Sequence, residues 1–210
     1  MKHVIFDFDG TLVDSLPVVV RIANQMVPKF NITDKELAKF REMPARDIIK
    51  YSGIPYWQLA RLMIRGKRLF GKHLDELKVF KGIDEVIKSL HQSGYQISVV
   101  SSNSEENIRL ILKREAIEAY ITGVYGNIGL FSKTRAFKVV LKDQKATADN
   151  ALYIGDEVRD IEAAHKAGIP IISVTWGYNG EKILKKYQPN YLAHTPAEML
   201  QIITTQAVTS

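Results

Sequence analysis

Two carboxylates near the start of the chain have the spacing of a catalytic or metal-binding pair. Residues 4–6 are apolar, as in a strand with both faces buried, and Asp7 and Asp9 follow with Gly10 directly behind. Because side chains alternate along a strand, both carboxylates would share one face if the extended conformation persisted. Like charges this close repel unless a cation or a shared proton lies between them. The pattern indicates a magnesium site, or a nucleophile with an acid beside it; a solvated loop after the strand is the structural alternative.

The longer string around this pair is more specific than the pair itself. Residues 7–12, Asp-Phe-Asp-Gly-Thr-Leu, resemble the first motif of the haloacid dehalogenase superfamily, whose members are mostly phosphatases. Three later segments resemble the remaining motifs in the family's order: an apolar run with hydroxyl residues at its end (97–103), Lys133, and Leu-Tyr-Ile-Gly-Asp-Glu-Val-Arg-Asp (152–160). The resemblance extends from residue 3 to about residue 178, with a gap where such enzymes insert a cap.

The resemblance implies a catalytic role for the first pair and a phosphate-binding role for the later motifs. Asp7 would be the nucleophile that forms an aspartyl-phosphate. Asp9 would protonate the leaving group and then deprotonate the hydrolytic water. Ser101, the Ser102 amide and Lys133 would bind the phosphoryl group.

The resemblance also implies Mg²⁺ as the cofactor. Its ligands would be Asp7, the Asp9 backbone carbonyl and Asp156, a set of hard oxygen donors. Asp160, one helical turn after Asp156, would hold a water bound to the ion or position Lys133, and Glu157 is the alternative for that role. Lys133 is followed by Thr134 where many relatives have proline, so Lys138 stays open as its replacement.

Asp9 favours phosphate monoesters as substrates, because the dehalogenase and phosphonate-cleaving branches of the family lack an acid at this position. We therefore expect a magnesium-dependent phosphatase that hydrolyses a small phosphate monoester, and residues 174–179 are similar to the phosphoglycolate phosphatase group. Three alternatives remain open: a phosphomutase of the beta-phosphoglucomutase type, a non-catalytic binding protein of this fold, and a receiver-type signalling domain. The second predicts eroded charged motifs, and the third predicts a shorter chain without a helical insert.

Strands and helices alternate along most of the chain. Strands are expected at 4–6, 96–101, 121–125, 151–154 and 171–174, with a helix after each of the middle three. This alternation predicts an α/β fold, a Rossmann-like three-layer core around a parallel sheet. The resemblance implies the strand order 5-4-1-2-3. Asp7 and Asp156 would then end neighbouring strands, at the edge where open parallel sheets bind ligands.

Residues 15–78 interrupt this alternation with helical periodicity alone. Thr33 to Glu36 have the form of a capping box, and Pro44 and residues 52–55 separate helices. We expect a core domain of residues 1–14 and 79–210 and a helical cap domain of residues 15–78, the cap acting as a mobile lid. Three basic residues of the cap are candidates to meet an anionic substrate: Arg46, Lys50 and Arg65.

Composition narrows the choice of partners. The chain has 210 residues, of which 46% are apolar and 25% charged, and it has no cysteine. These values and the lack of a long apolar run favour a cytoplasmic location and no membrane partner. The net charge of +6 is scattered, which suits steering of a small phosphorylated metabolite better than binding of nucleic acid. We expect a monomer or a homodimer.

Overall fold

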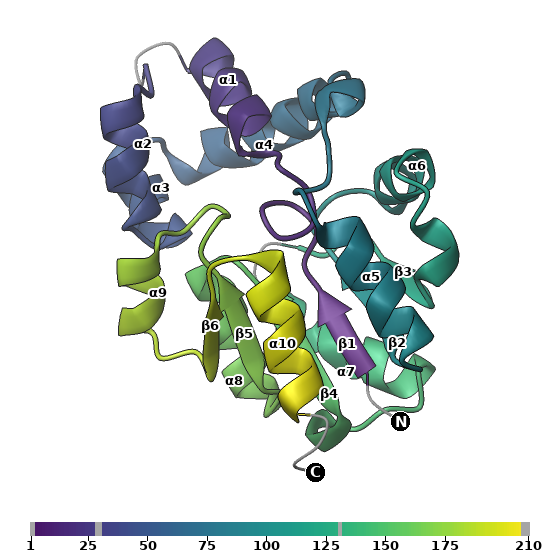
Figure 1. The fold of residues 1–210 in the computed structure, drawn as a ribbon. Helices are drawn as coiled ribbons and strands as arrows, with labels where there is room; N and C mark the ends of the chain where they lie inside the picture. Colours follow the sequence, from purple (N-terminus) through teal and green to yellow (C-terminus); the bar gives the residue numbers. More distant parts are fainter. Residues whose placement is uncertain (1–2, 28–30, 130–131, 207–210) are drawn as a thin grey trace.

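A six-stranded parallel sheet forms the centre of the molecule (Figure 1). The structure is a computed structural model that describes residues 3–27, 31–129 and 132–206. The strands lie in the order β3-β2-β1-β4-β5-β6. Their bounds are β1 His3–Phe6, β2 Gln96–Val100, β3 Gly123–Tyr125, β4 Ala151–Gly155, β5 Ile171–Val174 and β6 Tyr191–Ala193.

Strand β1 is central and buries both faces. It pairs with β2 on one side and β4 on the other, so that Phe6 lies level with Val99 and Ile154. Val4 and Phe6 belong to one hydrophobic cluster, and Ile5 between them belongs to the other. The alternation of side chains along a strand therefore explains why residues 4–6 are all apolar.

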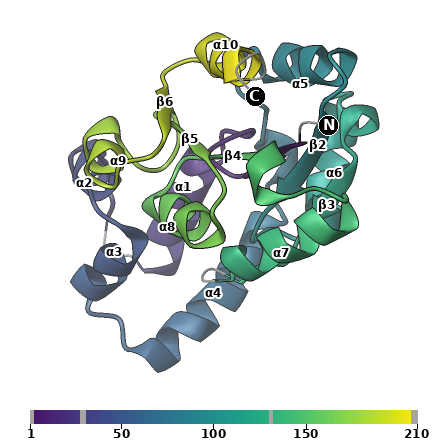
Figure 2. The ribbon, with the colours of Figure 1, turned by 90° about the horizontal axis from the view of Figure 1, so that it is seen from below.

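Helices cover the two faces of the sheet (Figure 2). One face carries α5 (Ile83–Gln92), α6 (Glu105–Arg114) and α10 (Pro196–Gln206). Their apolar side chains join the hydrophobic cluster that contains Val4 and Phe6. The other face carries α7 (Lys133–Asp143), α8 (Val158–Ala167) and α9 (Glu181–Lys186). Three short 3-10 helices, at Leu74–Glu76, Glu118–Tyr120 and Ala148–Asn150, lie in the connections. The result is three layers.

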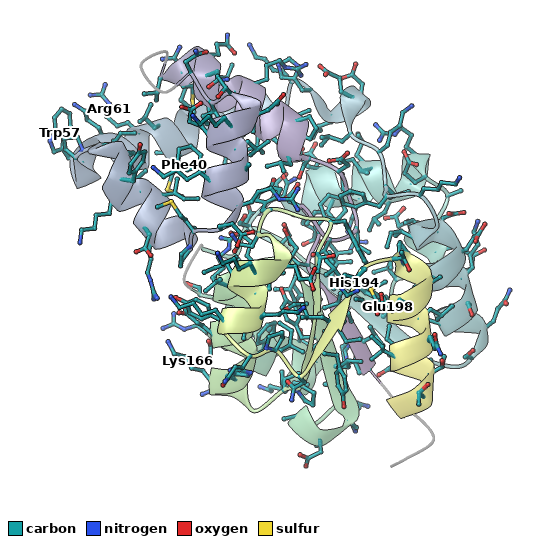
Figure 3. All side chains as sticks on the ribbon, turned by 60° about the vertical axis from the view of Figure 1, so that its left-hand side comes forward. Phe40, Trp57, Arg61, Lys166, His194 and Glu198 are labelled. Carbon is teal, nitrogen blue, oxygen red and sulfur yellow. The ribbon has the colours of Figure 1, made fainter. Side chains whose placement is uncertain are left out.

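Four helices lie between β1 and α5, at the end of the sheet toward which β1 points (Figure 1). They are α1 (Leu16–Met26), α2 (Asp34–Arg41), α3 (Ala45–Ser52) and α4 (Tyr56–Phe70), and the capping box predicted at Thr33 begins α2. The chain leaves and rejoins the core side by side, since Val13 bridges Val79 and the Asp14 amide donates to the Lys78 carbonyl at 2.9 Å. At the far tip of this group, Trp57 and Arg61 of α4 point away from the sheet (Figure 3).

The predicted α/β fold is confirmed, with one addition to the sheet. The order 5-4-1-2-3 is the observed order viewed from the opposite edge, but the prediction omitted β6. This strand has only three residues, of which Tyr191 and Leu192 are half-buried, so no apolar run marks it. It pairs with β5 through Ile172 and Tyr191, a contact that local sequence does not encode.

No helix in the described part of the chain is long and apolar enough to cross a bilayer.

Candidate active site

The residues of the sequence motifs meet at the carboxyl ends of β1, β2 and β4. The Asp7 amide donates to the Ile154 carbonyl at 2.8 Å, and the Ser101 amide donates to the Tyr125 carbonyl at 3.0 Å. The sheet pairing therefore continues for one residue beyond the strands on either side. This places the Asp7 side chain beside the loop that carries Asp156, as expected for neighbouring parallel strands.

Lys133, the first residue of α7, donates all three of its N–H groups to buried acceptors. Its Nζ lies 2.6 Å from Asp7 Oδ2 and 2.9 Å from the Tyr153 hydroxyl, and it also bonds to Asp160 Oδ1. The side chains of Lys133 and Asp7 are each only 4% exposed. Burial lowers the pKa of Lys133, but Asp160 and Asp7 together outweigh burial and raise it above the ordinary value. Lys133 is therefore a fixed positive charge against Asp7.

The carboxylates of this cluster repel one another in the absence of a bound cation. Burial raises the pKa of Asp7 to about 7, although Lys133 opposes this rise. The pKa of Asp156 is raised well above its ordinary value, first by burial and then by Glu157 and Asp7. A group of acids whose ionisation is this unfavourable is typical of a functional site rather than of a stabilising network.

The same carboxylates fit a magnesium ion. Asp7, Asp156 and Asp160 each offer an oxygen within 4.8 Å of the others, and carboxylate oxygens are the hard donors that Mg²⁺ prefers. Asp156 is held in place, because its oxygens accept from Thr11 Oγ1 at 2.8 Å and from the Tyr178 amide at 2.7 Å. The Asp9 backbone carbonyl, predicted as a further ligand, lies in the loop after β1, two residues from Asp7.

Gly10 lets the backbone pass close to this cluster. Its φ is +80°, and a Cβ atom there would strike the Asp156 carboxylate. A side chain at this position would therefore cost both backbone strain and displacement of a buried carboxylate.

Asp9 is held much more loosely than Asp7. Its Oδ1 is buried without a hydrogen-bond partner among the described residues. Its Oδ2 accepts long bonds from Ser101 Oγ at 3.4 Å and from Asn103 Nδ2 at 3.5 Å. Burial is the main cause that raises the pKa of Asp9, which favours the protonated form. A weakly bonded carboxyl whose protonated form is favoured suits a general acid.

A cavity of about 720 Å³ opens beside Asp9. Ser102, Asn103 and Asn127 line it on the core side. The opposite wall is apolar and comes from α1 and α4 with the end of α3: Val19, Ile22, Ala23, Met26, Ile49, Ile54, Leu59, Leu62, Met63 and Phe70. The carboxyl end of the sheet and the four-helix insert thus line one space.

All eight predicted site residues lie at this end of the sheet, where Ser101 contacts Asp9 and Ser102 lines the cavity beside it. Glu157 reaches the cluster through its backbone amide, which donates to Asp160 Oδ2 at 3.0 Å, whereas its Oε1 accepts from Arg159 Nε at 2.9 Å and not from Lys133. Asp160 is the residue that bonds to Lys133. Of the three basic cap candidates none lines the cavity, and Arg46 instead bonds to Glu162 at 3.1 Å and to the Tyr187 hydroxyl at 3.0 Å.

Several contributors escaped the sequence analysis. Thr11 lies inside the first motif, close to two carboxylates, so the sequence could have indicated a role for its hydroxyl at the site. Asn179 had no such signal. It is buried and makes four hydrogen bonds to two other segments: its amide donates to the Asp156 carbonyl, its Oδ1 accepts from the Val158 amide, and its Nδ2 donates to the carbonyls of Arg41 and Met43. It therefore connects the Asp156 loop with the α2–α3 turn of the insert.

Known proteins are similar to this chain in both sequence and fold. A phosphoglycolate phosphatase of Synechococcus elongatus is 37% identical over 207 residues, covering 97% of this chain and 98% of that protein. Pyrophosphatase PpaX of Listeria monocytogenes is 24% identical over 221 residues, covering 95% and 94%. The crystal structure of a predicted phosphatase from Clostridium acetobutylicum has the same fold, with a TM-score of 0.83 at 24% identity, covering 97% of this chain and 98% of that one. Residues 4–174 match the haloacid dehalogenase-like hydrolases, and the chain belongs to that family.

Proposed function

We propose that the protein is a magnesium-dependent phosphatase that hydrolyses a small phosphate monoester through an aspartyl-phosphate on Asp7. The contact of Asp7 with Lys133 at 2.6 Å, inside the cluster with Asp156 and Asp160, carries this proposal. A phosphoryl group needs an anionic nucleophile and nearby positive charge, and both stand here in one buried site.

In the first step, an Asp7 carboxylate oxygen attacks phosphorus while the bond from phosphorus to the leaving oxygen breaks. Asp7 is oriented for this attack by the Phe8 amide at 2.8 Å on Oδ1 and by Lys133 on Oδ2. Asp9 transfers its proton to the leaving oxygen, so that an alcohol rather than an alkoxide departs. Ser101 and the Ser102 amide hold the phosphoryl oxygens on the side facing β2.

In the second step, Asp9 takes a proton from water, and the water oxygen forms a bond to phosphorus. The bond from phosphorus to Asp7 breaks, which releases phosphate and restores both carboxyl groups. Mg²⁺, bound by Asp7, the Asp9 carbonyl and Asp156, would neutralise charge on the phosphoryl oxygens. Asp160 positions Lys133, to which it is hydrogen-bonded.

Residues 15–78 are proposed to form a cap domain that acts as a lid over this site, on a core of residues 1–14 and 79–210. The apolar wall from α1 and α4 faces Asp9 across the cavity, which supports this arrangement. Closing the lid would exclude bulk water and strengthen electrostatic contacts to the phosphoryl group. Hydrogen exchange in α1 to α4 should slow when Mg²⁺ and inorganic phosphate are added together; unchanged exchange would contradict a lid.

A panel of phosphate monoesters and one phosphoanhydride tests the function. The named activities of the relatives supply its members: 2-phosphoglycolate, pyrophosphate and a 5′-nucleotide, with p-nitrophenyl phosphate as a generic ester. Phosphate release that requires Mg²⁺ is the expected result. Conversion of a sugar phosphate to its isomer without phosphate release would favour the phosphomutase instead, and inertness toward every compound would contradict the proposal.

A further inference from the structure

The cavity beside Asp9 separates the catalytic residues into two groups. Asp9 and Arg159 line it, whereas Asp7, Lys133 and Asp156 do not. Under the proposed function, Asp9 protonates the leaving group, so a side chain that lines the same space as Asp9 faces the leaving group. Arg159 therefore stands on the leaving-group side of the reaction, and Lys133 on the phosphoryl side.

Arg159 has N–H donors without an acceptor among the described residues, whereas all three N–H groups of Lys133 are hydrogen-bonded. The Arg159 Nε and Nη2 both donate to a single oxygen, Oε1 of Glu157, and Nη1 donates to no acceptor among the described residues. The Arg159 side chain is 19% exposed, compared with 4% for Lys133. Glu157 thus holds one edge of the guanidinium in place, and the other edge keeps unused N–H donors on a side chain that lines the cavity.

Arg159 is also the cation best placed to meet a charged leaving group. Two other basic residues line the cavity, Lys67 and Arg68, and both are exposed on α4. Lys67 is already bonded to the Ser102 carbonyl at 2.9 Å. The other α1 and α4 residues that line the cavity are apolar and have no side-chain group that binds an anion.

We propose that Arg159 binds a carboxylate on the leaving group, so that the preferred substrates are small phosphorylated hydroxy acids. The open guanidinium edge presents parallel N–H groups, the geometry that pairs with a planar carboxylate through two hydrogen bonds. Glu157 positions this edge, which gives that residue a role different from the metal or lysine contact expected of it. The proposal rests on the proposed function and adds a substrate class and a specificity residue to it.

The test compares 2-phosphoglycolate with ethyl phosphate, which differ by the carboxylate at the same chain length. The measured quantity is the ratio of kcat/KM for the two compounds. The wild type should prefer 2-phosphoglycolate, and Arg159→Gln should lower this ratio by about 10- to 100-fold, the range for hydrogen bonds to a charged group. Arg159→Lys keeps a charge beside Glu157 but loses the paired geometry, so its ratio should lie between the other two.

Arg109→Gln is the matched control. Arg109 is an exposed arginine of α6 that pairs with Glu105 at 2.9 Å and lies outside the cavity, so its replacement should leave the ratio unchanged. A wild-type ratio near one, or an equal loss toward both compounds in Arg159→Gln and Arg159→Lys, would overturn the assignment. Either result combined with turnover of p-nitrophenyl phosphate would leave the phosphatase proposal standing, whereas no phosphate release from any ester would overturn both.

Discussion

The two ends of the parallel sheet bury polar groups in opposite ways. At the amino end, His3 of β1 and Ser98 of β2 form a buried hydrogen bond of 2.9 Å. Burial lowers the pKa of His3 to about 4, so this pair is neutral at pH 7. At the carboxyl end of the same strands, Asp7 lies against Lys133 and Asp160 in a cluster of full charges.

This difference separates stability from chemistry along a single strand. A buried neutral hydrogen bond contributes modestly to folding, about 1 kcal/mol. Buried charges lose hydration, and replacing them with uncharged groups of similar shape is often neutral or stabilising. Under the proposed function, the charges at the carboxyl end serve catalysis, and changes at the two ends should have different signatures. Activity should respond at the carboxyl end, and stability alone at the amino end.

Asp7→Asn should have the largest effect. The amide keeps the shape of the side chain and accepts from Lys133, but it forms no aspartyl-phosphate. Loss of a nucleophile can lower kcat by up to about a million-fold, and we expect a decrease of this size. The free energy of unfolding, measured with EDTA present, should stay equal or rise, because one of several repelling carboxylates is gone. A variant with a tenth of wild-type activity would refute the nucleophile assignment.

Removal of divalent cations should have the next largest effect. EDTA should reduce turnover of p-nitrophenyl phosphate by at least about a thousand-fold, since a cation supplies several kcal/mol of charge stabilisation. Added Mg²⁺ should restore the rate. Full activity in chelator would show that Asp7, Asp156 and Asp160 do not act through a metal.

Lys133→Met should lower activity and stability together. It removes the positive charge between Asp7 and Asp160 and leaves both carboxylates without this ion pair, and breaking a buried ion pair costs about 3–5 kcal/mol of unfolding free energy. Loss of one charge-stabilising donor should lower kcat by about 100- to 1,000-fold. Lys138→Met, which changes an exposed lysine on the same helix, is the control. Equal effects of the two variants would mean that Lys133 has no special role.

His3→Gln should change only stability, and only at low pH. Unfolded His3 takes up a proton below its ordinary pKa of 6.5, whereas the folded side chain stays neutral until about pH 4. The wild type therefore loses stability relative to His3→Gln as the pH falls through this window, by about 2 kcal/mol at pH 5. Urea unfolding at pH 7 and pH 5 measures this difference. A pH-independent difference, or altered kcat at pH 7, would contradict the contrast between the two ends.

Local sequence was enough where one segment carries its own signal. The strand at residues 4–6 is a continuous apolar run, and the strand at 171–174 is apolar except for Ser173. Asp7, Ser101 and Asp156 stand at or just after the ends of mainly apolar runs, so their positions at strand ends were predictable. The capping box at Thr33 was equally local, because its two partners are three residues apart. Strand β6 and helix α9 were missed since both are short and lack a periodic stripe.

The sequence by itself determined the α/β alternation, the helical insert and the acidic residues at the carboxyl ends of the strands. Only the tertiary structure decided which charges pair. Lys133 bonds to Asp7, 126 residues away, while Glu157 pairs with Arg159 instead of Lys133. The physical reason is that strand identity depends on short-range side-chain alternation, whereas ion pairing and cavity walls depend on distances that exist only after the sheet and insert have assembled.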